Sequence, residues 1–160
     1  MLDKETYYLK KTKLLMLQIF NMVMKTEEAA MKQSASSQNL SVAEMHTLVA
    51  IGRHEPKTMG TIAGELLVNV STLSIAVNKL EKKGYAERIR TQEDRRIVRI
   101  SLTDKGRSAL DLHEKFYFDM VEEACGDMDE AEKKLFIQSL ENMSHFFEKK
   151  LSSLEEKEQA

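Results

Sequence analysis

The side chains best suited to bind a polar ligand are concentrated in residues 69–102. Read at about 100° per residue, residues 70–83 form a helix with apolar side chains on one face and small polar side chains on the other. Hydroxyl and amide groups can hydrogen-bond to base edges and phosphates of a nucleic acid, and lysines can neutralise phosphates. The side chains predicted on this outer face are Ser71, Thr72, Ser74, Ile75, Asn78, Lys79 and Lys82.

One member of this outer face, Ile75, is apolar and has two interpretations. A single isoleucine exposed to solvent needs no explanation by itself. In the middle of a face that lies on DNA, it could instead contact the methyl group of a thymine. We prefer base contact, and plain exposure remains the alternative.

Three charged residues, Asp94, Arg95 and Arg96, lie between two β-prone runs, residues 85–90 and 97–102, and this pattern predicts a hairpin. Arg95 is suited to the narrow minor groove of DNA, where the negative potential attracts arginine. Asp94 would hold that arginine by a charge-assisted hydrogen bond, and Arg96 would pack toward the preceding helix or a phosphate. The alternative is a turn with three solvent-exposed charges.

Local signals define the elements that position these side chains. Asn69 can cap the helix that follows it, and Gly84 can end that helix in a left-handed conformation. A capping box at Ser41–Glu44 opens one upstream helix, to about Arg53, and Thr58 can cap the next. The sequence therefore predicts a helix-turn-helix at about residues 58–83, with a wing at about 85–102.

Long amphipathic helices are predicted on both sides of this region, at residues 4–33, from 104 to about 125, and from about 130 to 154. Their apolar stripes exceed what the small central lobe can bury, so a second copy of the chain is the economical partner. The residues expected at this homodimer interface are Leu9, Phe136, Leu140, Met143 and Phe147.

Composition fits one domain with helical extensions, because 42% of the 160 residues are hydrophobic and 31% are charged. No stretch reaches the roughly 18 apolar residues of a membrane span, and the start lacks a signal peptide, so we expect a cytoplasmic protein with no membrane partner. The net charge of −2 hides an asymmetry: residues 79–107 hold ten basic and five acidic residues, whereas residues 119–160 hold five lysines and twelve acids. This separation is typical of a DNA binder, although ordinary solvated faces can also produce it.

The sequence offers no arrangement typical of catalysis. The four histidines lack the spacing of metal ligands, and the single cysteine, Cys125, lies beside acids that do not stabilise a thiolate. No nucleophile triad, glycine-rich phosphate loop or carboxylate pair is recognisable. We therefore predict no enzyme activity and no cofactor, and a metal site only if the fold brings distant residues together.

A combination of motifs makes the interpretation more specific. The pattern LxxxxSTxxxxVxxLEKKGYxER at residues 66–88, then DRR and LTDKG, resembles the winged helix-turn-helix of MarR-family transcription regulators. The resemblance implies a mainly α fold with a small β-wing, whose helix enters the major groove of DNA and whose wing arginine enters the minor groove. It also implies a single domain, with residues 1–35 and 104–155 as a helical dimerisation lobe and residues 40–103 as the DNA-binding lobe.

Four segments, QIFNMV, SVAEMHTLVAIG, KKGYAERIRTQEDRR and LHEKFYFDMVEE, resemble the FabT-like branch of that family, which represses bacterial fatty-acid-synthesis genes. Members of that branch bind acyl chains carried on acyl carrier protein. The resemblance implies an acyl pocket among the first helix, the helix after Ser41 and the helix after Thr103, although periodicity alone would assign the same side chains to an ordinary core. The candidates to line it are Met16, Phe20, Met24, Met45, His46, Val49, Phe116 and Met120.

These observations together predict a homodimeric repressor that binds a palindromic DNA operator and responds to acyl chains on acyl carrier protein. Two alternatives remain open. A regulator of the same fold could be released from DNA by phenolic or drug-like effectors, and a helical protein-interaction module would not bind DNA at all.

Overall fold

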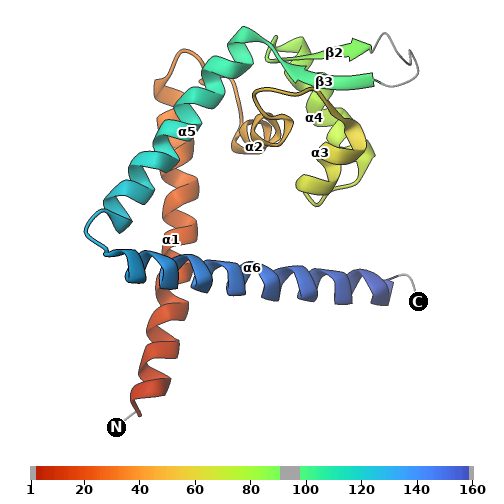
Figure 1. Ribbon diagram of the computed structural model, residues 1–160. Coiled ribbons are helices and arrows are strands. Elements are labelled where there is room, and N and C mark those ends of the chain that lie inside the picture. Colours follow the sequence, from red (N-terminus) through yellow and green to blue (C-terminus); the bar gives the residue numbers. More distant parts are fainter. Residues whose placement is uncertain (1–2, 91–97, 159–160) are drawn as a thin grey trace. The chain divides into compact units, whose positions relative to one another are not determined.

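The computed structural model describes residues 3–90 and 98–158, which form helices and one small antiparallel sheet (Figure 1). The chain divides into two compact units, Met1–Phe116 and Tyr117–Ala160, and each is described by itself. This architecture confirms the predicted fold class, mainly α with a small β-wing. The elements are α1 (Lys4–Gln33), α2 (Val42–Ile51), β1 (Lys57–Thr58), α3 (Met59–Glu65), α4 (Val70–Lys82), β2 (Ala86–Arg90), β3 (Val98–Leu102), α5 (Asp104–Cys125) and α6 (Glu130–Glu158).

The helices of the first unit begin at the capping residues that the sequence predicts. Asn69 Oδ1 accepts a hydrogen bond from the Thr72 backbone N–H at 2.8 Å, which satisfies one unpaired donor of the first turn of α4. At the start of α2, the Ser41 and Glu44 side chains each accept from the other's backbone N–H, so the capping box is complete. These local contacts fix where α2 and α4 start.

The inward face of α4 forms the centre of the core of the first unit. Leu73, Val77 and Leu80 are at most 1% exposed, and each side chain of this kind contributes about 1.5–3 kcal/mol when fully buried. In Figure 1, α2 is seen end-on between the first half of α5 and the pair α3 and α4. The other large side chains buried in this core include Met45, Leu48, Ile51, Ile62, Tyr85, Ile100 and Leu102.

The sheet has the strand order β1-β3-β2, with all neighbours antiparallel. Strands β2 and β3 are the two sides of the predicted wing and pair from Ala86 opposite Leu102 to Arg90 opposite Val98. Strand β1 was not predicted, because its two residues carry no period of their own and are held only by pairing with β3.

Gly106 permits the close approach of α5 to the backbone of Tyr85, which follows α4. A Cβ atom at Gly106 would lie 2.1 Å from the Tyr85 carbonyl oxygen, which is far inside van der Waals contact. Thr103 supports the same junction, because its hydroxyl donates to the Gly84 carbonyl oxygen at 2.7 Å and its backbone N–H donates to the Tyr85 carbonyl oxygen at 3.1 Å. The LTDKG motif is thus a packing requirement where the wing meets α5.

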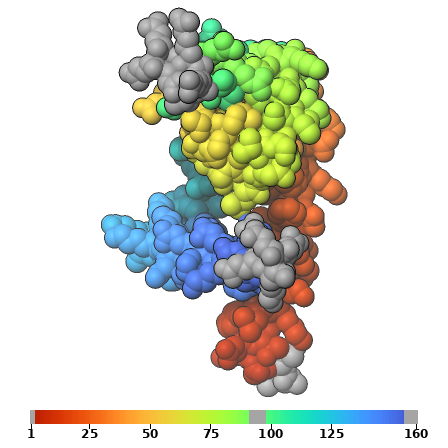
Figure 2. Space-filling model, turned by 90° about the vertical axis from the view of Figure 1, so that its right-hand side faces the viewer, coloured from red at the N-terminus to blue at the C-terminus, as the bar shows by residue number. Residues whose placement is uncertain are grey.

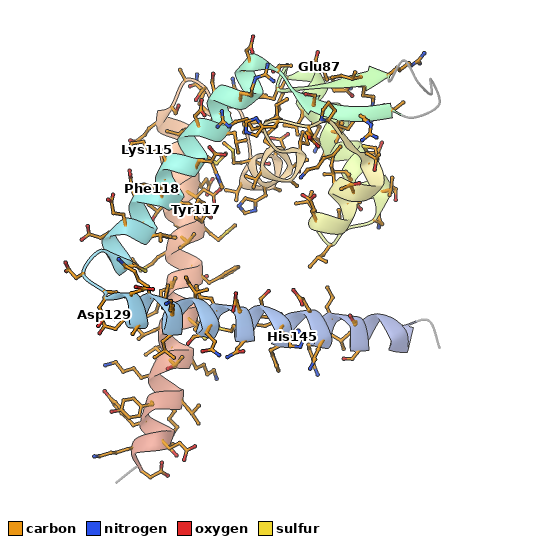
Figure 3. The ribbon with its side chains drawn as sticks, in the orientation of Figure 1. Glu87, Lys115, Tyr117, Phe118, Asp129 and His145 are labelled. Atoms are coloured by element: carbon orange, nitrogen blue, oxygen red, sulfur yellow. The ribbon has the colours of Figure 1, made fainter. Side chains whose placement is uncertain are left out.

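The second unit contains the end of α5 and all of α6. Side chains project from α6 along its length, as Figure 3 shows around the labelled His145. Many of them are apolar and exposed in the single chain, including Leu135, Ile137, Leu140, Phe146 and Phe147. Among the described residues no single helix is long and apolar enough to cross a membrane, and only the pair α3 and α4, bent by 105°, has the length and composition together.

Candidate nucleic-acid interface

The outer face of α4 presents the polar side chains that the sequence predicts. Ser71, Thr72, Asn78, Lys79 and Lys82 are exposed and Ser74 is half-buried. Ile75 is 61% exposed at the middle of this face, so it is available for contact and is not part of the core. Figure 2 shows α3 and α4, coloured yellow to yellow-green, as one continuous face of the first unit.

The first turn of α4 uses part of its hydrogen-bonding capacity internally. The Ser71 hydroxyl donates to Asn69 Oδ1 at 2.7 Å, and the same oxygen caps the helix. In this arrangement the Ser71 oxygen keeps its lone pairs and can accept from an amino group of a base. To donate to a phosphate, the hydroxyl must first leave Asn69.

Arg88 of β2 is a residue of this surface that the sequence analysis did not single out. Its Nη2 donates to Asn78 Oδ1 at 2.9 Å, and its Nη1 lies 2.7 Å from Glu81 Oε2. The contact leaves the Asn78 amide N–H groups to donate outward and ties β2 to the outer face of α4. No local pattern in the sequence indicated this contact, because its partners lie on two different elements.

The predicted minor-groove group lies outside the residues that the structure describes. Asp94, Arg95 and Arg96 fall within residues 91–97, outside the described part of the chain, and their roles stay predictions. The pairing of β2 with β3 reaches Arg90 and Val98, the residues on either side of that segment.

The C-terminal end of α4 is held by a partly buried ion pair. Lys83 Nζ donates to both carboxylate oxygens of Glu44, at 2.7 and 2.8 Å, and to the Asn39 carbonyl oxygen at 2.7 Å. Burial raises the pKa of the Glu44 carboxyl, but the hydrogen bonds from Lys83 and Ser41 outweigh it, so the pKa is held below its usual value. Glu44 therefore stays ionised and links α2 to the end of α4.

A second set of ion pairs joins the segment just after α2 to α5. Arg53 Nη2 contacts Asp111 and lies 2.8 Å from Glu114 Oε2. The hydrogen bonds to Asp111 and Glu114 raise the pKa of the Arg53 guanidinium above its already high value, so this cation is permanent. The Glu44–Lys83 pair thus links α2 to the end of α4, and Arg53 links the segment after α2 to α5.

The residues predicted to line an acyl pocket differ widely in their exposure in the single chain. Met45 is fully buried in the core of the first unit, whereas Phe20 is 67% exposed and Val49 is 41% exposed. A groove of about 430 Å³ lies between α2 and α4, and His46 is the predicted pocket residue that lines it. Of the remaining candidates, Met24 and Phe116 are half-buried, Met16 is 36% exposed, and Met120 of the second unit is 37% exposed.

The predicted interface residues lie on helices with exposed apolar surface. Leu9 of α1 is 68% exposed, and Phe147 of α6 is 57% exposed. Phe136 and Leu140 line an apolar groove of about 550 Å³ in the second unit, formed by the end of α5 and the start of α6. Met143 is half-buried on α6.

Fold and surface define the class of protein: a winged helix-turn-helix with an exposed polar recognition face on α4. A model of the MarR family matches residues 38–97. FabT of Streptococcus pneumoniae, solved in complex with DNA, is 35% identical over 88% of this chain and 98% of that chain, with a TM-score of 0.79. The chain therefore belongs to the MarR family.

Two curated relatives match this chain over shorter stretches than FabT does. The HTH-type transcriptional regulator SarZ of Staphylococcus saprophyticus is 40% identical over 60 residues, which are 38% of this chain and 41% of SarZ. The HTH-type transcriptional repressor MdtR of Bacillus subtilis is 29% identical over 76 residues, 48% of this chain and 49% of MdtR. The chain thus spans less than half the length of these two relatives, and both are regulators of transcription, not enzymes.

Proposed function

We propose that this protein is a transcriptional regulator that binds a specific DNA operator through α4 and the wing. The observation that carries the proposal is the exposed polar face of α4, held by the Lys83–Glu44 ion pair at its end and by Arg88 at its side. The similarity to FabT, which was solved in complex with DNA, supports the same surface. In this arrangement the hydroxyl, amide and lysine side chains of α4 contact bases and phosphates. DNA can reach them without any rearrangement of the core, because they are already on the surface.

The operator-binding form is a homodimer. Exposed leucine, phenylalanine and tyrosine side chains on α1 and α6 favour association, because monomeric proteins rarely leave such large apolar patches in water. A two-fold symmetric dimer places its two recognition helices in successive major grooves, about 34–36 Å apart. The operator is therefore a palindrome with half-sites about one helical turn apart.

The regulated genes are those of fatty-acid synthesis, and the effector is an acyl chain on acyl carrier protein, which tightens repression. The support is the likeness of the chain to FabT over nearly its whole length and the four sequence segments typical of that branch. The flexible methionines of α1, such as Met16 and Met24, suit a pocket that must open around an irregular apolar ligand.

The test is a gel-shift titration with the DNA upstream of the protein's own gene and of fatty-acid-synthesis genes, at fixed salt. The expected result is binding that tightens when acylated carrier protein is added and does not change with unacylated carrier protein. Release of DNA by a phenolic or drug-like compound, with no response to acyl chains, would replace the acyl assignment. Absence of salt-dependent binding to any of these sequences would leave only a protein-interaction module.

A further inference from the structure

Three residues from three helices of the first unit meet at one buried point. Glu27 of α1 has a side chain only 2% exposed, and its Oε1 lies 3.2 Å from His46 Nε2 of α2 and 3.3 Å from His113 Nε2 of α5. The ligand atoms that these side chains offer all lie within 4.8 Å of one another. A carboxylate and two imidazoles are a donor set that zinc takes in proteins.

The separations fit a metal ion of that size. Four ligand atoms about 2.0–2.1 Å from a zinc ion at tetrahedral angles lie about 3.3–3.4 Å apart. Two edges of such a tetrahedron are already present in the distances from Glu27 to the two imidazoles. The third edge, between the imidazoles, closes by rotation of His46, whose side chain is 40% exposed.

We propose that Glu27, His46 and His113 bind a divalent cation of the zinc class. A cavity of about 10 Å³, lined by Glu27, Met31, His113 and Phe116 among others, adjoins two of the three ligands. That volume suits a single small particle such as an ion or its bound water. Three protein ligands leave a fourth position of the tetrahedron for a water molecule.

The electrostatics of the cluster suit a metal. The neutral imidazole is the form that binds metals, and the Glu27 carboxylate supplies the negative charge that compensates a buried cation. The alternative is a metal-free network in which Glu27 accepts hydrogen bonds from both imidazoles.

Metal binding at this point would act on the surface of α4. His46 contributes both to the cluster and to the groove of about 430 Å³ whose opposite wall includes Leu73, Ile75 and Lys79. Drawing His46 toward Glu27 and His113 fixes α2 against α1 and α5, and α2 supports α4 through the Glu44–Lys83 pair. The metal is thus an effector of operator affinity; this part rests on the proposed function, whereas the binding of the metal does not.

The test uses the full-length, tag-free chain after removal of metal with a chelator. Cobalt is added first, because tetrahedral Co²⁺ with nitrogen and oxygen ligands absorbs visible light, and zinc is then added to displace it. The expected result is one Co²⁺ per chain, displaced by Zn²⁺, and a Zn²⁺ affinity measurable against a chromophoric chelator. Zinc should also raise the melting temperature of the wild type, since a ligand that binds only the folded state stabilises it.

Two variants make the result specific. His46→Gln removes a partly exposed ligand, which the core does not need, and Glu27→Gln removes the buried carboxylate with little change in shape. Each should weaken Zn²⁺ binding by more than about 100-fold, since loss of an outer-shell partner alone costs about 10–100-fold. His145→Gln is the matched control, because His145 lies on α6 with its side chain 64% exposed.

The outcomes separate cleanly. A wild type that takes up no cobalt or zinc, or a folded His46→Gln variant that binds as tightly as the wild type, overturns the site and leaves the hydrogen-bonded network. Circular dichroism of each variant shows whether it is folded, and His46→Gln keeps the test decisive if Glu27→Gln is not. If zinc binds but operator affinity does not change, only the effector role is overturned. If the wild type does not bind operator DNA either with or without zinc, the result counts against the proposed function itself.

Discussion

Replacing Lys83 with methionine should destabilise the first unit without altering the outer face of α4. Removing one partner of a buried ion pair costs about 3–5 kcal/mol, whereas exposed pairs contribute about 0–1 kcal/mol. The pair is intermediate, because the Glu44 side chain is 9% exposed and the Lys83 side chain is 35% exposed. Ser41 would still donate to Glu44 at 2.8 Å. We therefore expect the free energy of unfolding to fall by about 2 kcal/mol, which lowers the melting temperature by roughly 4–8 °C.

Urea denaturation followed by circular dichroism measures this loss, and the adjacent Lys82 provides the matched control. Lys82 is exposed on the face proposed for DNA, so Lys82→Met should change the free energy of unfolding by less than about 0.5 kcal/mol. The two variants should affect operator affinity in the opposite order. Lys82→Met should lower the affinity and flatten its salt dependence, because a phosphate contact is lost, whereas folded Lys83→Met should bind nearly as the wild type does.

The same contact predicts how the stability difference depends on pH. The pKa of Glu44 is lowered from 4.5 in the folded protein, where the Lys83 and Ser41 hydrogen bonds outweigh burial. A carboxyl with a lowered pKa contributes stability above its unfolded pKa and loses that contribution as the pH falls through its folded pKa. The difference between wild type and Lys83→Met should be constant near neutrality and shrink in acid. A Lys83→Met protein as stable as the wild type, or a difference that persists unchanged in acid, would refute the reasoning.

Three further changes test the wing, the dimer and the pocket. Arg95→Ala should weaken operator binding by about 1–3 kcal/mol with little change in melting temperature, and unchanged affinity at physiological salt would contradict the minor-groove role. Phe147→Asp should convert the dimer into a monomer in sedimentation runs, because an unpaired charge buried at the interface costs several kcal/mol; a wild type that is already a folded monomer at micromolar concentration would remove the basis for this expectation. Met24→Trp should abolish the response to acylated carrier protein and leave basal operator affinity intact, measured by the same gel shift. If Met24→Trp loses basal binding as well, Met24 belongs to the structural core.

The features that the sequence predicts well depend on neighbours a few residues away. Asn69, Ser41 and Thr58 cap their helices as expected, because each side chain reaches a backbone N–H in the next turn. Gly84 has a φ of 77°, the left-handed conformation expected after the end of α4. The inward and outward faces of α4 follow the same rule, since burial repeats with the helical period.

The contacts that join separate elements were not predictable in this way. Glu44 was recognised as a capping residue, but its second role, as the partner of Lys83, required the ends of α2 and α4 to be placed together. Arg88 was counted among the basic residues of its segment, and nothing local showed that it would reach Asn78. In each case a charged side chain has several exposed poses along its own element, and only the packed fold selects one.

The cluster at Glu27 is a further contact between separate elements that the sequence does not predict. Helical spacing places Glu27 among the charged residues of α1, where a glutamate normally faces water, yet its side chain is 2% exposed. A carboxylate pays too large a desolvation cost to be buried without compensation, so its burial itself requires partners. The two imidazoles come from α2 and α5, and their separation along the chain has no metal-binding spacing. A buried acid that faces histidines from two other helices is therefore a signal of a site that only the tertiary structure can give.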